Sequence, residues 1–214
     1  MKNSKKLFSF FLLSIISLIA IQIPFTQLLG SNVHFTLFDF IAPTLGSFMG
    51  IFPAITAVFG IQVLNYIIHG SQFDVGGIIR LFPTLFAVVY FSQKRSLNWI
   101  IPILAIVAFD LNPIGRSAWQ YSMFWLIPVF ANFFHKNIFA RSLGATFTAH
   151  AVGGVLWVWT FGLSKELWLS LIPVVIVERL ALAAGITLFY FVFSKVLNYA
   201  TKKKILSLPN ISIS

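Results

Sequence analysis

Long hydrophobic segments alternate with short polar ones along the whole chain. In order, the hydrophobic segments cover 7–29, 38–50, 52–69, 76–92, 97–111, 117–134, 142–163 and 167–198. Several approach the roughly 20 apolar residues that a helix needs to cross a bilayer. The pattern therefore predicts an all-α fold, a polytopic bundle of membrane helices.

The stretch from Phe38 to Ile67 decides how the chain is threaded. It carries one charge, Asp39, and its thirty residues are too many for a single upright membrane helix. Gly50 and Pro53 stand near its middle, and proline is tolerated in the first turn of a helix, where its missing N–H costs nothing. The sequence predicts two helices that fold back on each other as a hairpin.

The first helix of this hairpin is too short to cross the bilayer alone. Residues 38–50 span about 20 Å at ~1.5 Å per residue, whereas the hydrocarbon core is roughly 30 Å thick. We expect neighbouring helices to shelter it. Small residues recur every four positions, a spacing that lets helix backbones approach closely; they are Ala42, Gly46, Gly50 and Ala54.

Basic residues cluster between the hydrophobic segments. With the hairpin counted as two spans, the chain has eight membrane helices, and eleven of its fifteen Lys and Arg residues fall on the side of both termini. Cytoplasmic loops carry such an excess of positive charge, so we predict that both termini are cytoplasmic. The alternative count is six or seven helices. We expect one membrane domain over 1–200 and a basic cytoplasmic tail over 201–214.

Composition agrees with a membrane location and argues against several classes of function. The chain is 58% hydrophobic and 9% charged, whereas soluble domains carry roughly 25% charged residues. The net charge of +10 follows the loops, so we expect the lipid bilayer of a prokaryotic cytoplasmic membrane, and no nucleic acid, as the partner. Cysteine is absent, and so are the common hydrolase, metalloprotease and phosphate-loop motifs. We therefore expect no catalytic residue, metal site or cofactor.

Three ionisable residues lie deep in predicted membrane helices, where charge is costly and marks a site or a structural pair. His150 and Glu178 both lie about 16–18 Å from the outer ends of consecutive helices, at ~1.5 Å per residue, so they could meet. Glu178 and Arg179 are adjacent and point about 100° apart, so we expect each to find its partner elsewhere. Ligand binding and structural pairing are equal alternatives for these residues.

A second group of polar residues gathers at the predicted outer ends of helices. It consists of His34, Asp39, His69, Asp74 and Arg80. Each alone is explained as a solvated loop residue, but together they suggest one functional face. Arg80 could bind a carboxylate or phosphate. We take Asp39, His69 and Arg80, together with His150, Glu178 and Arg179, as candidate substrate-binding residues.

Two consecutive stretches, FDFIAPTLGSFMGIFPAITAVFGIQVLNYIIHG and DVGGIIRLFPTLFAVVYFSQKR, carry a family resemblance. They are similar to the central part of the S components of energy-coupling factor (ECF) transporters, and the likeness covers roughly residues 1–96. The shared features are a short helix that begins with acidic and aromatic residues, a helical hairpin with glycines at regular spacing, and a basic cytoplasmic loop. The family fold typically has six helices, whereas eight are predicted here.

The resemblance implies a substrate-capture subunit of a micronutrient uptake transporter. S components bind a vitamin or related small molecule from the extracytoplasmic side, and a transmembrane coupling subunit with two ATPases drives its release inward. Two other functions stay open. One is a non-transport membrane scaffold of similar fold, and the other is a membrane enzyme that uses Glu178 and His150 as acid and base.

Overall fold

The computed structural model describes residues 2–27, 34–69, 74–92 and 96–203. This part of the chain is almost entirely helical, and its elements in order are α1 (Lys2–Ala20), β1 (Pro24–Gln27), β2 (His34–Thr36), α2 (Phe38–Met49), α3 (Ile51–Ile68), α4 (Val75–Arg80), α5 (Pro83–Ser92), α6 (Leu97–Leu111), α7 (Pro113–Ser117), α8 (Trp119–Ser122), η1 (Met123–Trp125), α9 (Leu126–Ala131), η2 (Asn132–Phe134), α10 (Ile138–Phe161), α11 (Lys165–Ser170) and α12 (Ile172–Lys202).

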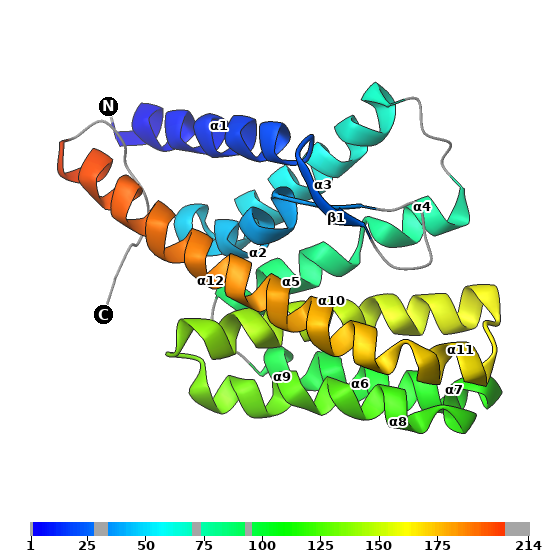
Figure 1. Ribbon diagram of the computed structural model, residues 1–214. Helices are drawn as coiled ribbons and strands as arrows, with labels where there is room; N and C mark the ends of the chain where they lie inside the picture. The colour runs from blue at the N-terminus through cyan, green and yellow to red at the C-terminus, as the bar shows by residue number, and fades with distance from the viewer. Residues whose placement is uncertain (1, 28–33, 70–73, 93–95, 204–214) are drawn as a thin grey trace.

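The long helical segments run back and forth between two ends of the molecule (Figure 1). The start of α1 and the end of α12 lie at one end, and α4 and α11 lie at the other. Helix α10 is central, because it packs against α5, α12, α6 and α9. The short helix α2 packs against α5, α12, α3 and α1.

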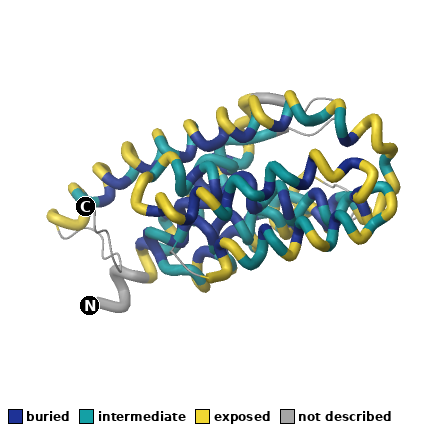
Figure 2. Tube along the Cα trace, turned by 90° about the horizontal axis from the view of Figure 1, so that it is seen from below, coloured by how far each residue is buried: buried dark blue, intermediate teal, exposed yellow. Residues whose placement is uncertain are grey.

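Three helical segments within the described residues are long and apolar enough to cross a membrane. They are Ile51–Ile68, Val75–Ser92 and Ile172–Lys202, and two shorter apolar helices cover Leu7–Ala20 and Leu97–Leu111. Buried positions lie on the inward sides of the helices (Figure 2). The outward side of α12 is apolar, with Val177 and Leu188 exposed at 68% and 67% of their surfaces. Such a surface suits contact with lipid tails.

The stretch from Phe38 to Ile67 is interrupted at Gly50, as predicted. Gly50 has φ +92°, a conformation that residues with a side chain rarely adopt, and it separates α2 from α3. Pro53 falls in the first turn of α3. The chain reverses direction there (Figure 1). The expectation that α2 is sheltered is also confirmed, since most of its residues are buried.

Several predicted boundaries are wrong. The first helix ends at Ala20 rather than at residue 29, and Pro24–Gln27 pairs antiparallel with His34–Thr36 in a two-stranded sheet. The segment predicted over 117–134 is divided among α8, η1, α9 and η2. Helix α12 continues to Lys202, past the predicted end of its segment at residue 198 and into the predicted tail over 201–214. The remainder of that tail, 204–214, lies outside the described residues.

Two hydrophobic clusters form the interior. The large cluster joins α1, α2, α3 and α5 to parts of α10 and α12, and it is rich in alanine and aliphatic side chains. The aromatic cluster joins α6, α8, η1, α10, α11 and α12, and it includes Phe109, Tyr121, Trp125, Phe147 and Trp168. The two clusters meet along α10 and α12, which contribute residues to both.

Candidate functional site

A cavity of about 630 Å³ lies between the two clusters, and residues of α4 and α11 are part of its lining. Its volume falls in the range of small-molecule sites, roughly 300–1,000 Å³. Most of its lining is apolar. The polar and ionisable residues of the lining are Thr36, Asp39, Gln62, Asn65, Tyr66, Arg80, Thr84, Tyr121, Thr146, His150, Glu178 and Arg179.

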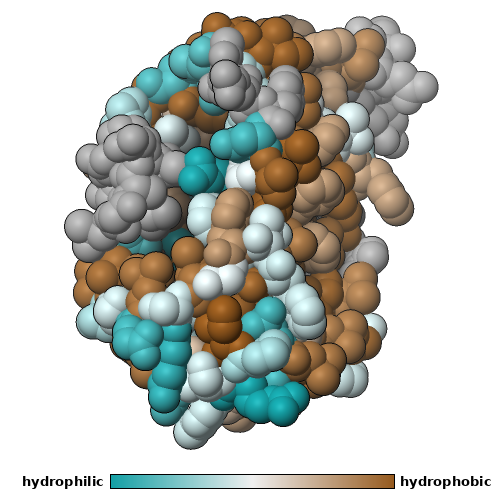
Figure 3. Space-filling view, turned by 90° about the vertical axis from the view of Figure 1, so that its right-hand side faces the viewer, coloured by the Kyte–Doolittle hydropathy of each residue, from teal (hydrophilic) through white to brown (hydrophobic). Residues whose placement is uncertain are grey.

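The surface at the end of the molecule that carries α4 and α11 is mixed. Figure 3 shows hydrophilic side chains interspersed with hydrophobic ones, and the hydrophobic surface is broadest along the right-hand side of the view. Helix ends and short connecting elements form this face, namely the end of α3, α4 and α11. The cavity therefore lies close to a face where polar and apolar surfaces meet.

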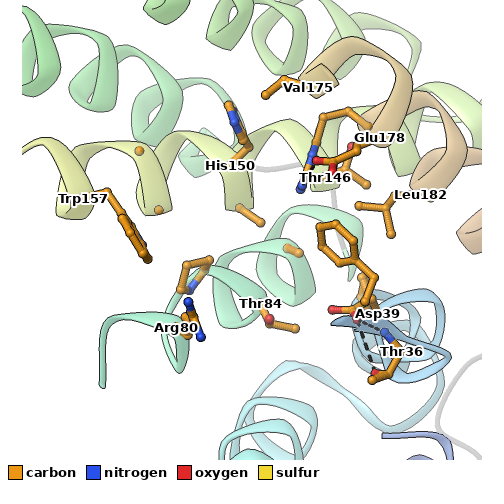
Figure 4. A pocket seen from close by; sticks show the side chains of 18 of the residues that line it. Thr36, Asp39, Arg80, Thr84, Thr146, His150, Trp157, Val175, Glu178 and Leu182 are labelled. Atoms are coloured by element: carbon orange, nitrogen blue, oxygen red, sulfur yellow. Dashed lines mark hydrogen bonds and ion pairs between the residues drawn. The ribbon is translucent and has the colours of Figure 1, made fainter. Parts of the chain in front are cut away.

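Five of the six candidate residues line this one cavity. They are Asp39, Arg80, His150, Glu178 and Arg179. His150 and Glu178 lie near each other on one wall, which α10 and α12 form (Figure 4). Arg80 and Trp157 lie together at another side, and Asp39 faces them across the cavity (Figure 4).

His69 is not part of the cavity lining. It is exposed beyond the last turn of α3, and its Nδ1 lies 2.9 Å from the carbonyl oxygen of Asn65. The sequence placed it correctly at a helix end, but the structure does not bring it together with the other five candidates.

Glu178 and Arg179 contact each other, contrary to the sequence-based expectation. The Arg179 Nη2 and Glu178 Oε2 atoms are 3.6 Å apart, and both side chains are almost buried. Adjacent residues on a helix diverge at Cα, but these two side chains are long enough to bend back toward each other. The separation exceeds that of a strong charge-assisted hydrogen bond. The contact is therefore a loose ion pair.

Arg179 also has other neighbours. Its guanidinium carbon lies 5.3 Å from the centre of the Phe35 ring, within the range of a cation–π contact. The carboxylates of Glu178 and Asp39 favour its positive charge. Its Nε atom is buried and has no hydrogen-bond partner among the described residues.

Asp39 fixes the junction between β2 and α2. Its Oδ2 accepts hydrogen bonds from the backbone N–H of Thr36 at 2.7 Å and from the Thr36 hydroxyl at 3.3 Å. These bonds tie the start of α2 to the strand before it. One oxygen of this carboxylate is thus engaged locally.

His150 is held by two aromatic side chains that the sequence did not single out. The Trp125 indole N–H donates to His150 Nδ1 at 3.0 Å, and the Tyr121 hydroxyl lies 2.8 Å from His150 Nε2. Tyr121 and Trp125 are four residues apart, a spacing that places two side chains on one side of a helix. This spacing is the signal that could have found the pair, although η1 interrupts the helix before Trp125.

Arg80 stands at the edge of the cavity. It is exposed, and its guanidinium carbon lies 5.7 Å from the centre of the Trp157 ring. Both residues also line a smaller neighbouring cavity of about 390 Å³. Trp157 therefore takes part in the site.

The donor atoms of the cavity suit an organic ligand better than a metal ion. Among the described residues no group of three or more His, Cys, Asp or Glu side chains could hold a metal ion. The cavity instead combines apolar walls with a few polar groups from different elements, which is typical of sites for small organic molecules.

Comparison with known proteins gives one relative without an assigned function. The chain is 27% identical over 216 aligned positions to an uncharacterized protein, MJ0923, of Methanocaldococcus jannaschii, and the match covers 90% of this chain and 72% of that protein. No protein-family model and no solved structure matches the chain.

Proposed function

We propose that this protein is an integral membrane subunit that captures a small, vitamin-like molecule from the extracytoplasmic side, in the manner of an ECF S component. The observation that carries the proposal is the cavity of about 630 Å³, which gathers five of the six ionisable residues selected from the sequence. Ionisable groups in a membrane protein are expensive unless they serve a site or pair with one another. Here they surround a space of the size of a small molecule.

The direction of capture follows from the proposed topology. We propose eight membrane passes with both termini in the cytoplasm, because the basic residues then follow the positive-inside rule. The start of α1 and the end of α12 lie at the same end of the molecule, which supports an even number of passes. The cavity lies toward the opposite end, so it would open to the outside. An ECF coupling subunit with two ATPases would be the partner for release.

Topology is tested with reporter fusions. A reporter in the loop containing Lys94 and a reporter at the C-terminus should both respond as cytoplasmic. If the two fusions report opposite sides, the proposed eight-pass topology is wrong.

Binding is tested by blocking the cavity. Ala149 lines the cavity on α10, whereas Ala184 is exposed on α12. The protein is purified in mild detergent, and small molecules that accompany it are identified by mass spectrometry. They should accompany the wild type and the Ala184→Phe variant but not Ala149→Phe. The same pattern should appear in ligand-dependent melting with a panel of vitamins.

Glu178→Gln separates ligand contact from structural pairing. If Glu178 contacts the ligand, the variant should bind about tenfold more weakly, a loss of ~1.4 kcal/mol, with little change in folding. A destabilised variant, together with wild-type protein that no vitamin stabilises, would instead favour a membrane scaffold.

A further inference from the structure

The wall of the cavity formed by α8, η1 and α10 contains a directional chain of hydrogen bonds. Trp125 Nε1–H donates to His150 Nδ1, and His150 Nε2 lies 2.8 Å from the Tyr121 hydroxyl oxygen. Trp125 is fully buried and Tyr121 is 4% exposed, so both rings are held by their surroundings. His150 and Tyr121 line the cavity, while Trp125 stands behind them.

The indole group fixes the tautomer of His150. An indole N–H can only donate, so His150 Nδ1 must offer a lone pair and carry no proton. A neutral imidazole then carries its proton on Nε2. The His150 Nε2–H therefore donates to the Tyr121 oxygen, and the hydroxyl hydrogen of Tyr121 is left to donate to another acceptor. A charged imidazolium would direct a second N–H against the indole N–H.

Arg179 supplies a second group with unused donor capacity on the same cavity as Tyr121. It is 8% exposed. Its contact with Glu178 is loose at 3.6 Å, and its buried Nε has no hydrogen-bond partner among the described residues. Buried guanidinium groups normally satisfy their donors. A planar acceptor beside Arg179 would draw the guanidinium into a better-bonded position.

The donors near Tyr121, rather than the total charge of the lining, favour an acceptor over a cation at this place. The lining carries two guanidinium groups, Arg80 and Arg179, and two carboxylates, Asp39 and Glu178. A cationic group would stand against Arg179 and would leave the Tyr121 hydroxyl hydrogen without an acceptor. A carboxylate would accept from both.

We propose that the wall near Tyr121 binds the carboxylate of a ligand whose remaining body is apolar, with Tyr121 and Arg179 as donors and His150 as a positioning residue for the Tyr121 hydroxyl. This inference rests on the proposed capture function and names the substrate class for the same cavity. The apolar walls contact the apolar part of the ligand, and the two donors, Tyr121 and Arg179, bind its carboxylate.

Three probes with one apolar body test the proposal: 3-phenylpropanoate, 3-phenylpropanamide and 3-phenylpropylamine. Their binding to the full chain in lipid nanodiscs is followed by thermal stabilisation. The carboxylate should stabilise the protein at concentrations at least tenfold lower than the amide requires, and the amine should not stabilise it. Tyr121→Phe should reduce the carboxylate-to-amide preference about fivefold, which corresponds to one hydrogen bond.

Two variants of His150 distinguish positioning from a structural role. His150→Gln keeps an N–H donor that can reach Tyr121, so it should retain most of the carboxylate preference, whereas His150→Leu should lose it. A purely structural His150 would lower the melting temperature in one or both variants and leave the preference unchanged. An unchanged carboxylate preference in both His150 variants would overturn the proposal. So would a preference for the amine, or a lack of binding by all three probes.

Failure of this inference is distinguishable from failure of the capture function. If small molecules accompany the wild type but not Ala149→Phe, and the probe series has no preference for the carboxylate, capture stands and the carboxylate class is wrong. If no small molecule depends on the open cavity, both are wrong.

Discussion

The large cluster and the aromatic cluster are held together in different ways. In the large cluster, hydroxyl groups such as those of Thr44 and Thr148 bond to carbonyl oxygens of their own helices. In the aromatic cluster, polar groups bond between elements: Trp125 to His150, and Ser122 to Asp110. A directional bond between elements also occurs in the large cluster, where the Tyr90 hydroxyl donates to the Pro128 carbonyl oxygen at 2.6 Å. The two regions therefore differ in degree: shape contributes more to the first, and hydrogen bonds between elements contribute more to the second.

This difference explains where the cavity lies. Close packing of small and aliphatic side chains leaves little free space, so α2 and α5 fill the large cluster. In the aromatic cluster the rings contact one another edge to face, and hydrogen bonds to His150 also fix the rings of Tyr121 and Trp125. The cavity runs along the boundary, where α10 contributes Thr146 and His150 to its lining. A site that discriminates between ligands benefits from side chains held rigidly by hydrogen bonds, as in the aromatic cluster.

The largest expected effect comes from disturbing the shape of the large cluster. A Cβ atom at Gly46 would overlap the side chain of Ser92 on α5, whereas a Cβ atom at Gly60 would meet nothing within 4 Å. Gly46→Leu should therefore lower the free energy of unfolding by about 3 kcal/mol, the upper end of typical overpacking costs. Gly60→Leu is the matched control and should be nearly neutral. Thermal unfolding in detergent measures both, and equal losses would contradict close packing as the basis of this cluster.

The second prediction removes one directional bond from the aromatic cluster. Trp125→Phe deletes the N–H that donates to His150 and leaves a buried acceptor without its partner, which should cost about 2 kcal/mol. Trp159→Phe is the control, because Trp159 is 57% exposed and donates to the Ala108 carbonyl at the periphery. Its cost should stay below ~1 kcal/mol. If Trp125→Phe is as mild as the control, shape also governs the aromatic cluster.

Much of the fold could be predicted from the sequence, because membrane helices follow from apolar run length and the positions of Gly and Pro. The break at Gly50 is one such case. The strand at Pro24–Gln27 was missed because the apolar run continues past the end of α1, although Pro24 lacks the N–H that a continuing helix needs. The apolar run alone cannot distinguish a last helical turn from a strand.

The candidate site was predictable as far as charge is concerned. Ionisable residues within long apolar segments are costly to bury, which marks Glu178, Arg179 and His150 in the sequence, and the structure places all three on one cavity. Tyr121 and Trp125 carry no charge, and their rings resemble the interfacial aromatics common in membrane proteins. Their role depends on which atoms face His150, and only the arrangement of α8, η1 and α10 determines that.

The third prediction tests the boundary between the clusters. Asp39→Asn keeps an acceptor for Thr36 but removes the charge that strengthens the bond, so the free energy of unfolding should fall by about 1 kcal/mol. Asp74 is the control: it accepts from Gly77 N–H at the exposed start of α4, where Asn caps a helix equally well. Asp74→Asn should be nearly neutral in thermal unfolding. A neutral Asp39→Asn would mean that the charge of Asp39 does not stabilise the β2–α2 junction.

The smallest expected effect lies at the periphery of the aromatic cluster, where α11 holds Trp168 in place. Ser164 caps α11 by accepting a hydrogen bond from Leu167 N–H. Hydrogen bonds from the Glu166 backbone and from the Ser164 hydroxyl lower the pKa of the exposed Glu166 below its ordinary value of 4.5.

Because the folded-state pKa of Glu166 is depressed, the stability that Glu166 contributes is complete above about pH 4.5 and is lost as the pH falls through the lower folded value. The melting temperature of the wild type should therefore fall slightly more between about pH 5 and pH 3 than that of Glu166→Gln, which has no titrating group at this position. Trp168 fluorescence offers a second measurement, since loosening of α11 would change the surroundings of its buried ring. If the two proteins show the same pH dependence, the cap of α11 is independent of the Glu166 charge, and Trp168 is held by its ring contacts with Phe109 and Tyr121 alone.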